Sequence, residues 1–215
     1  MRIILVDDHQ LMRDGLKAVL EREEDLEVVG EASDGLEAVE IAQKLRPDIV
    51  LMDISMPGLN GMDATRRLCA HMPRLRVIGL SMNADRRYVH AMFEAGACGY
   101  LLKSSAADEL IRAVRAVARG EKYVSPAIAG VVLEGFVGGA DAATPDDPLA
   151  RLSTREREVL QLLAEGLTTK EIAARLGLAA STVETHRRQI SAKLEVRTVA
   201  ELTKLAIRAG LTSIN

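Results

Sequence analysis

Aromatic residues and cysteines are scarce in this sequence. Phenylalanine, tyrosine and tryptophan make up 2% of the 215 residues, and tryptophan is absent. This scarcity argues against a wall of stacked aromatic side chains of the kind that binds single-stranded nucleic acid or sugars. The two cysteines, Cys69 and Cys98, are too few for a disulfide framework or a cysteine-rich zinc site.

The sequence also lacks the apolar segments of a membrane or exported protein. No apolar stretch approaches the roughly 20 residues of a membrane-spanning helix. The chain opens on the strand-like run MRIILVDD, which differs from the basic and then apolar pattern of a signal peptide. We therefore expect a soluble cytoplasmic protein with no membrane partner.

Charge is divided unevenly along the chain, whose net charge is −3. Residues 1–150 carry 17 basic and 24 acidic side chains, whereas residues 151–215 carry 11 basic and 7 acidic ones. This asymmetry favours two domains with separate roles. It makes the basic C-terminal part a candidate for binding a polyanion.

Residues 1–122 alternate short apolar runs with stretches of helical periodicity. This alternation predicts a doubly wound α/β domain, in which helices cover both faces of a five-stranded parallel sheet. The runs interpreted as strands are residues 2–6, 26–30, 48–52, 76–80 and 98–102. We assign 1–122 to this domain and 123–150, which is rich in Gly, Pro and Asp, to a linker in which residues 131–133 extend a short helix.

Residues 151–215 carry regularly spaced signals for short helices. Four times a hydroxyl residue is followed three positions later by glutamate, the pattern of a capping box at a helix N-terminus. The pairs are Ser153 with Glu156, Thr168 with Glu171, Ser181 with Glu184, and Thr198 with Glu201. Gly166, Gly177 and Gly210 lie where the first, second and fourth helices should end. The pattern predicts a small all-α domain of four helices, with a tight turn at 177–180 joining the second to the third.

Polar side chains follow four of the predicted strands. Asp7 and Asp8 follow the first, Asp53 the third, Ser81 the fourth and Lys103 the fifth. These groups should converge, because the carboxyl ends of parallel strands meet at one edge of the sheet. Clustered carboxylates suit Mg²⁺, and the cation with Lys103 would hold a phosphoryl group to which Ser81 donates a hydrogen bond. Taken alone, the first two aspartates could simply cap a helix.

These residues lie in motifs that resemble the receiver domain of bacterial two-component response regulators. The motifs are VDDHQ at 6–10, LMDISMPGLNGMD at 51–63, Ser81, and GYLLK at 99–103. The resemblance implies a flavodoxin-like fold in which Asp53 accepts a phosphoryl group from a sensor histidine kinase. It also implies that Asp8, Asp53 and the main-chain carbonyl of Ser55 hold Mg²⁺, with Asp7 in a supporting role.

The same resemblance implies roles for residues around the acceptor. Lys103 would pair with phosphoryl oxygens, while Ser81 and Tyr100 would change position on phosphorylation. Ser55 and Asn83 stand where family members tune hydrolysis of the acyl phosphate. Ser104 follows Lys103 where many members have proline, and we expect this difference to alter the loop but not the chemistry.

The third predicted C-terminal helix, roughly residues 182–194, has an apolar stripe and a short polar outer face. Such a helix, entered by a tight turn from another helix, suits the DNA major groove. The alternative from the pattern alone is a small bundle with solvated charges. His186 on this helix has no second ligand nearby in the sequence and is a poor metal candidate.

Two C-terminal segments resemble the LuxR-type helix-turn-helix, namely LSTREREVLQLLAEGLTTKEIAARLGL at 152–178 and STVETHRRQISAKL at 181–194. With the receiver, the whole chain resembles a NarL/FixJ-class response regulator. The resemblance places Glu184, Thr185 and Arg188 at base-edge positions and makes Lys170, Arg187 and Lys193 neighbours of DNA phosphates. Glu184 could accept a hydrogen bond from cytosine or remain in its own capping box, so direct readout rests mainly on Arg188. Thr169 stands where Asn is common.

The resemblance implies a transcription regulator that catalyses nothing beyond its own phosphorylation and dephosphorylation. Phosphorylation would unmask the helix-turn-helix and favour a homodimer on double-stranded promoter DNA. The last predicted helix would supply a dimer face or would cover the other three helices. The apolar residues of that helix are Val199, Leu202, Leu205 and Ala206.

Three other functions were considered. A phosphatase of the haloacid-dehalogenase kind needs a second carboxylate two residues after the nucleophile, and Asp53-Ile54-Ser55 lacks it. A nucleotide-binding protein is disfavoured because no glycine-rich phosphate-binding loop follows the first strand. A receiver whose helical domain binds another protein is the third alternative, which salt-dependent binding to DNA would exclude.

Overall fold

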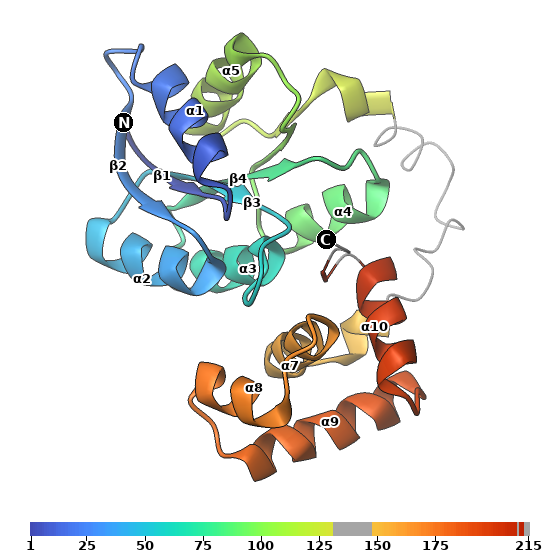
Figure 1. The fold of residues 1–215 in the computed structure, drawn as a ribbon. Helices are drawn as coiled ribbons and strands as arrows, with labels where there is room; N and C mark the ends of the chain where they lie inside the picture. The colour runs from blue at the N-terminus through green and yellow to red at the C-terminus, as the bar shows by residue number, and fades with distance from the viewer. Residues whose placement is uncertain (131–147, 210, 213–215) are drawn as a thin grey trace. The chain divides into compact units, whose positions relative to one another are not determined.

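The structure is a computed structural model that describes residues 1–130, 148–209 and 211–212. The chain divides into two compact units, Met1–Ala140 and Asp141–Asn215. The first is an α/β domain and the second is helical (Figure 1). Among the helices described, none combines the length and the hydropathy needed to span a bilayer.

The first unit is built on a parallel sheet with the strand order β2-β1-β3-β4-β5-β6. Its strands are β1 (Arg2–Val6), β2 (Glu27–Ala32), β3 (Ile49–Asp53), β4 (Arg76–Ser81), β5 (Gly99–Leu102) and β6 (Tyr123–Val124). Every neighbouring pair is parallel. The order of the first five strands is that of flavodoxin-like folds, so the predicted fold class is confirmed.

Helices cover both faces of this sheet (Figure 1). They are α1 (Gln10–Leu20), α2 (Gly35–Leu45), α3 (Gly61–His71), α4 (Arg86–Glu94) and α5 (Ala107–Ala118). Because successive strand residues point to opposite faces, Ile4 and Val50 pack with α2, α3 and α4, whereas Leu5 and Leu51 pack with α1 and α5. All four residues are fully buried. Burial on both faces explains why the strands are almost continuously apolar.

The sheet has six strands rather than the five expected. The additional strand, β6, pairs with β5 through Gly99 with Tyr123 and Tyr100 with Val124. With two residues, β6 is too short to give the apolar run by which strands are predicted. Beyond it, the Ser125 amide donates to the Tyr100 carbonyl at 2.9 Å. Regular structure therefore continues past residue 122, and residues 126–130 are helical, whereas the expected helix at 131–133 lies outside the described residues.

The second unit packs short helices around an apolar core. After a 3₁₀ turn at Pro148–Arg151 come α7 (Thr154–Ala164), α8 (Thr169–Leu176), α9 (Ala180–Leu194) and α10 (Val199–Arg208). The predicted capping boxes at Ser153, Thr168 and Thr198 are confirmed. Gly177 ends α8 in the left-handed conformation, with φ of 63°. The predicted stop at Gly210 lies outside the described residues.

The fourth predicted capping box, Ser181 with Glu184, is wrong. Helix α9 begins at Ala180 after the N-cap residue Ala179, whose side chain makes no cap. Ser181 therefore lies inside the first turn. Glu184 instead accepts a hydrogen bond from Thr169 of α8, a tertiary partner that a local sequence pattern does not reveal.

The apolar faces of α9 and α10 turn toward the core of this unit. Val183 and Ile190 of α9 are fully buried, as the predicted stripe requires. On α10, Leu202 and Ala206 are buried and the helix packs on α7, whereas Val199 is 45% exposed. Most of the apolar face of α10 thus covers the domain, and Val199 is left for a further contact.

Candidate functional site

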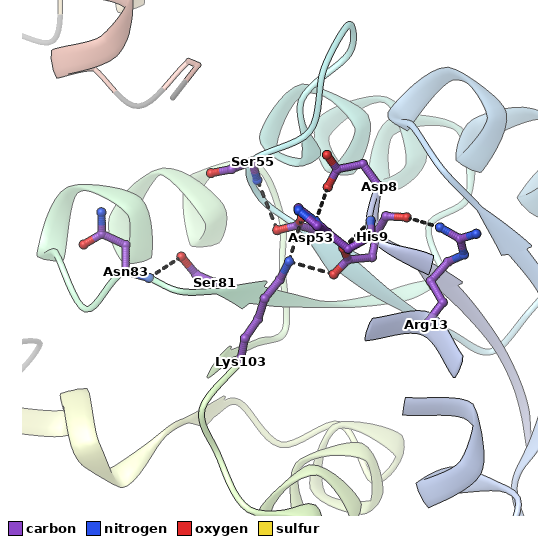
Figure 2. Close-up of polar contacts among 9 residues, drawn as sticks. Asp8, His9, Arg13, Asp53, Ser55, Ser81, Asn83 and Lys103 are labelled. Atoms are coloured by element: carbon purple, nitrogen blue, oxygen red, sulfur yellow. Dashed lines mark hydrogen bonds and ion pairs between the residues drawn. The ribbon is translucent and has the colours of Figure 1, made fainter. Parts of the chain in front are cut away.

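Acidic and basic side chains meet at the carboxyl edge of the sheet (Figure 2). Asp53, the last residue of β3, is 2% exposed, and Asp7, which follows β1, is fully buried. The Lys103 Nζ atom, just after β5, lies 2.7 Å from Asp7 Oδ2 and 2.8 Å from Asp53 Oδ2. Asp8 lies beside them, within the same acidic cluster. The structure therefore brings together the three carboxylates and the ammonium group expected at this edge.

Burial and charge set the ionisation of this cluster. Loss of hydration raises the pKa of Asp53 to about 6, and although Lys103 opposes that rise, the Asp7 carboxylate adds to it. Burial alone would lower the pKa of Lys103, but the Asp53 and Asp7 carboxylates outweigh it and hold that pKa above its usual range. At neutral pH the site thus combines an ionised Asp53 carboxylate with a fixed positive charge.

The donor atoms of this cluster fit a hard divalent cation. Asp7, Asp8, His9 and Asp53 each offer a ligand atom, and these atoms lie within 4.8 Å of one another. Oδ2 of Asp7 and Oδ1 of Asp8 are buried and contact basic groups, Lys103 Nζ at 2.7 Å and His9 Nδ1 at 2.9 Å. Carboxylate oxygens are the ligands that Mg²⁺ prefers. We regard the carboxylates as the fitting set, since the exposed His9 imidazole contacts Asp8 at 2.9 Å.

Arg13 belongs to this site although no sequence motif points to it, and its side chain extends from α1 beside Asp8 and His9 (Figure 2). Its Nη1 atom donates to the main-chain carbonyl of Asp7 at 2.7 Å. Its Nε atom donates to Glu31 of β2 at 3.3 Å, and its side chain is 15% exposed. One basic residue in an amphipathic helix gives no sequence signal for a contact to the main chain.

The loops after β3 and β4 bring further polar groups to the site. The Ser55 amide donates to Asp53 Oδ1 at 3.2 Å, and the Asn83 amide donates to Ser81 Oγ at 2.9 Å (Figure 2). Tyr100 is buried and its hydroxyl donates to the Asn83 carbonyl at 2.8 Å. Burial raises the pKa of Tyr100 to about 12, so the phenol keeps its proton. The loop beyond Ser81 is thereby joined to β5.

A close backbone approach explains one glycine of the motif at 51–63. A Cβ atom on Gly61 would lie 1.9 Å from the Asp53 carbonyl oxygen. The Gly61 amide donates to the Ile54 carbonyl at 3.0 Å, and Asn60 caps α3 by accepting from the Asp63 amide at 2.9 Å. The start of α3 is therefore held directly against the main chain of the candidate acceptor.

The residues expected at DNA lie on α8 and α9. Lys170 and Arg188 are exposed and make no hydrogen bond or ion pair within the described part of the chain. Thr185 is also exposed, and its hydroxyl donates to the Ser181 carbonyl of its own helix at 3.0 Å. These three side chains are placed to meet a ligand at the surface.

Other expected DNA residues already have partners in the helical unit. Lys193 Nζ lies 2.6 Å from Oε2 of Glu156, which is the buried capping residue of α7. Burial would raise the pKa of Glu156, but Lys193 and the Ser153 cap outweigh it and hold that pKa below its usual range. Glu184 and Arg187 contact each other and Thr169. The sequence pattern showed neither the Lys193–Glu156 contact nor the link to Thr169, because those partners lie on other helices, whereas Glu184 and Arg187 are three residues apart on α9.

Comparison with known proteins matches each of the two units to a protein family. Residues 3–115 match the response regulator receiver domain, and residues 150–206 match the bacterial regulatory proteins of the luxR family. The transcriptional regulatory protein LiaR of Bacillus subtilis (strain 168) is 41% identical over 209 residues, spanning 97% of this chain and 96% of LiaR. The oxygen regulatory protein NreC of Staphylococcus carnosus (strain TM300) is 38% identical over 214 residues, spanning 98% of this chain and 99% of NreC.

A solved structure is similar to this chain over nearly its whole length. The RcsB–DNA complex is similar with a TM-score of 0.59 and 28% identity, over 95% of this chain and 96% of that chain. The fold and both matches define a receiver joined to a LuxR-type DNA-binding domain. The chain belongs to the NarL/FixJ class of two-component response regulators, which are DNA-binding transcription regulators and not classical enzymes.

Proposed function

We propose that this chain is a phosphorylation-dependent regulator in which Asp53 accepts a phosphoryl group from a sensor histidine kinase. The observation that carries the proposal is the contact of Lys103 with both Asp53 and Asp7 in one buried cluster. A carboxylate held beside a fixed cation can attack a phosphoryl group whose charge that cation stabilises. The carboxylates of Asp7, Asp8 and Asp53 offer oxygen atoms within 4.8 Å of one another, a set of ligands that fits Mg²⁺.

The proposed step moves a phosphoryl group from nitrogen to oxygen. An Asp53 oxygen bonds to phosphorus while the bond from phosphorus to the kinase imidazole breaks, and the imidazole nitrogen keeps that electron pair. Lys103 exchanges its contact with Asp53 for a phosphoryl oxygen, and Ser81 donates its hydroxyl to another. Asp8, Asp53 and the Ser55 carbonyl, with Asp7 in support, would hold Mg²⁺, whose positive charge would offset the repulsion between these carboxylates and the phosphoryl group.

The new charge would be sensed first by the loop after β4. Ser81 contacts Asn83, and Asn83 accepts from Tyr100, so movement of Ser81 toward the phosphoryl group disturbs both contacts. In addition, Ser55 and Asn83 flank the acceptor, where they would tune hydrolysis of the acyl phosphate. The proposed output is an unmasked helix-turn-helix and a homodimer.

A homodimer also suits DNA binding on electrostatic grounds. Two basic domains make more phosphate contacts than one, and symmetric half-sites would lie about 10 base pairs apart. The exposed Val199 on α10 is the candidate for a dimer contact within the helical unit. The RcsB–DNA complex supports double-stranded DNA as the partner. A regulator of this kind would work in the cytoplasm.

Phosphate transfer can be tested with labelled acetyl phosphate and Mg²⁺ on the full chain. Asp53→Asn should incorporate no label, because it removes the attacking oxyanion. Asp14→Asn alters an exposed aspartate on α1 and should label like wild type. Labelling of the Asp53 variant at the wild-type level would refute the assignment.

DNA binding can be tested with duplexes selected by the full chain from a random-sequence library. Treatment with acetyl phosphate should tighten binding of wild type but not of Asp53→Asn, and affinity should fall steeply with salt. Arg188→Ala should weaken the selected duplex much more than random duplex. Failure of wild type to enrich any duplex would favour a helical domain that binds protein.

A further inference from the structure

Three side chains join the N-terminus of α8 to the polar face of α9. Thr169 Oγ1 donates to Glu184 Oε1 at 2.6 Å. Arg187 Nη1 donates to that hydroxyl oxygen and to Glu184 Oε1, both at 3.0 Å. Each member of this cluster, named here the α8–α9 triad, therefore contacts the other two.

The hydrogen bonds of the triad occupy the Glu184 carboxylate and the Arg187 guanidinium, the groups that would otherwise contact DNA. Glu184 is 43% exposed and Arg187 is 32% exposed, so both face the surface only in part. The Thr169 hydroxyl and then Arg187 hold the pKa of Glu184 below its usual range, which keeps the carboxylate ionised. For Glu184 to accept from a cytosine amino group, it would have to exchange these two charge-assisted hydrogen bonds for one.

Charge balance explains how a carboxylate at this position is compatible with DNA nearby. An ionised carboxylate near the phosphate backbone is repelled by it, whereas a carboxylate neutralised by Arg187 is not. The neighbouring Arg188 is exposed and makes no hydrogen bond or ion pair within the residues that the structure describes. The two adjacent arginines therefore have different surroundings despite their adjacent positions.

We infer that Glu184 and Arg187 are positioning residues that fix the register of α9 on α8 through Thr169, leaving base readout to Arg188. The inference rests on the proposed DNA-binding function. Ile172 of α8 and Val183 of α9 belong to one apolar core, and apolar packing is not directional. The triad is directional, because movement of α9 along α8 by one helical turn would break both hydrogen bonds that Thr169 makes.

The test uses the full chain and the duplex that wild type selects from a random library. Thr169→Val removes the hydroxyl but keeps the branched shape, Thr169→Ser restores the hydroxyl, and Glu184→Ala removes the carboxylate. Thr203→Val, at a partly exposed position on α10, which carries none of the candidate DNA residues, is the matched control. Thermal unfolding of each variant establishes that it is folded before binding is measured.

Thr169→Val and Glu184→Ala should each weaken binding roughly 3- to 10-fold, the range for losing one or two hydrogen bonds. The variant that carries both changes should have about the same affinity for DNA as the single variant that binds less tightly, because both changes break the same cluster. All of these variants should select the same bases as wild type. Thr169→Ser and Thr203→Val should bind like wild type.

Two results would overturn the inference and leave the proposed function intact. One is a changed base preference at a single position for Glu184→Ala but not for Thr169→Val, which would show direct readout. The other is additive loss in the double variant, which would show that the two residues act independently. Absence of any selected duplex with wild type would overturn the proposed function, and with it this inference.

Discussion

The guanidinium of Arg13 donates a 2.7 Å hydrogen bond to the main-chain carbonyl of Asp7. This bond holds the peptide unit that joins Asp7 to Asp8, the two acidic residues that follow β1. Glu31 of β2 holds the same guanidinium at 3.3 Å. Arg13 therefore connects α1 with two strands at the point where the carboxylates must be oriented.

Arg13→Ala should lower the affinity for Mg²⁺ about tenfold and slow phosphorylation by acetyl phosphate, since a hydrogen bond to a charged group contributes roughly 1.5–3 kcal/mol. Isothermal titration with Mg²⁺ measures the affinity without a chromophore. Arg115→Ala removes an exposed arginine that pairs with Glu23 and Asp25, and it should leave both properties unchanged. Wild-type Mg²⁺ affinity in a folded Arg13→Ala protein would contradict the positioning role.

Asp53→Asn should stabilise the chain at neutral pH when divalent cations are absent. Burial raises the folded-state pKa of Asp53 from 3.8 to about 6, so the folded protein binds this proton more tightly than the unfolded chain does. The stability of the wild type therefore falls as the pH rises between about 4 and 6. The Asp53→Asn variant does not lose stability in this way, because asparagine does not ionise. The difference should reach at most about 3 kcal/mol above this window.

Urea unfolding in EDTA at pH 4.5 and pH 7.5, taken as roughly the two ends of the transition, measures this difference. The control is Asp14→Asn, whose effect should not follow the same pH dependence. A gain in stability that is equal at both pH values would show that the cause is not the ionisation of Asp53.

Gly61→Ala should destabilise the receiver by about 1–3 kcal/mol and reduce phosphorylation, because overpacking moves the main chain. The new Cβ atom would meet the Asp53 carbonyl oxygen at 1.9 Å, so the proposed acceptor residue must shift. Gly15→Ala is the matched control within α1, where an added Cβ meets nothing within 4 Å. That change should be neutral or stabilise the protein by about 0.5–1 kcal/mol. Equal effects of the two changes on chemical denaturation would contradict the prediction.

Lys193→Ala and Lys170→Ala should have different effects. Lys193→Ala leaves the Glu156 carboxylate, whose side chain is 3% exposed, without its ammonium partner. The helical domain should lose about 1–2 kcal/mol of stability, with little change in the salt dependence of DNA binding. Lys170→Ala should leave stability unchanged and reduce the slope of log affinity against log salt by about one. A similar fall in slope for Lys193→Ala would make Lys193 a phosphate contact after all.

The residues predicted best from the sequence are those whose positions depend on the order of the strands. Asp53 and Lys103 follow buried apolar runs, and parallel topology alone brings the ends of such runs to one edge. Contacts between elements were not predictable in this way. Arg13 reaches a main-chain carbonyl, and Glu184 binds a hydroxyl 15 residues away in preference to the local partner at Ser181. The local capping rule favoured the nearer hydroxyl, and tertiary packing decided otherwise.

The pairing of β6 with β5 connects Tyr100 to the point where the chain leaves the sheet. Val124 pairs with Tyr100, and the next residue, Ser125, is bonded to the carbonyl of the same tyrosine. A displacement of β5 at Tyr100 must therefore pull on the backbone from which the chain leaves the sheet. Because residues 126–130 follow β6, the strand paired with β5 at Tyr100, even a small displacement of that tyrosine would be transmitted to them along the main chain.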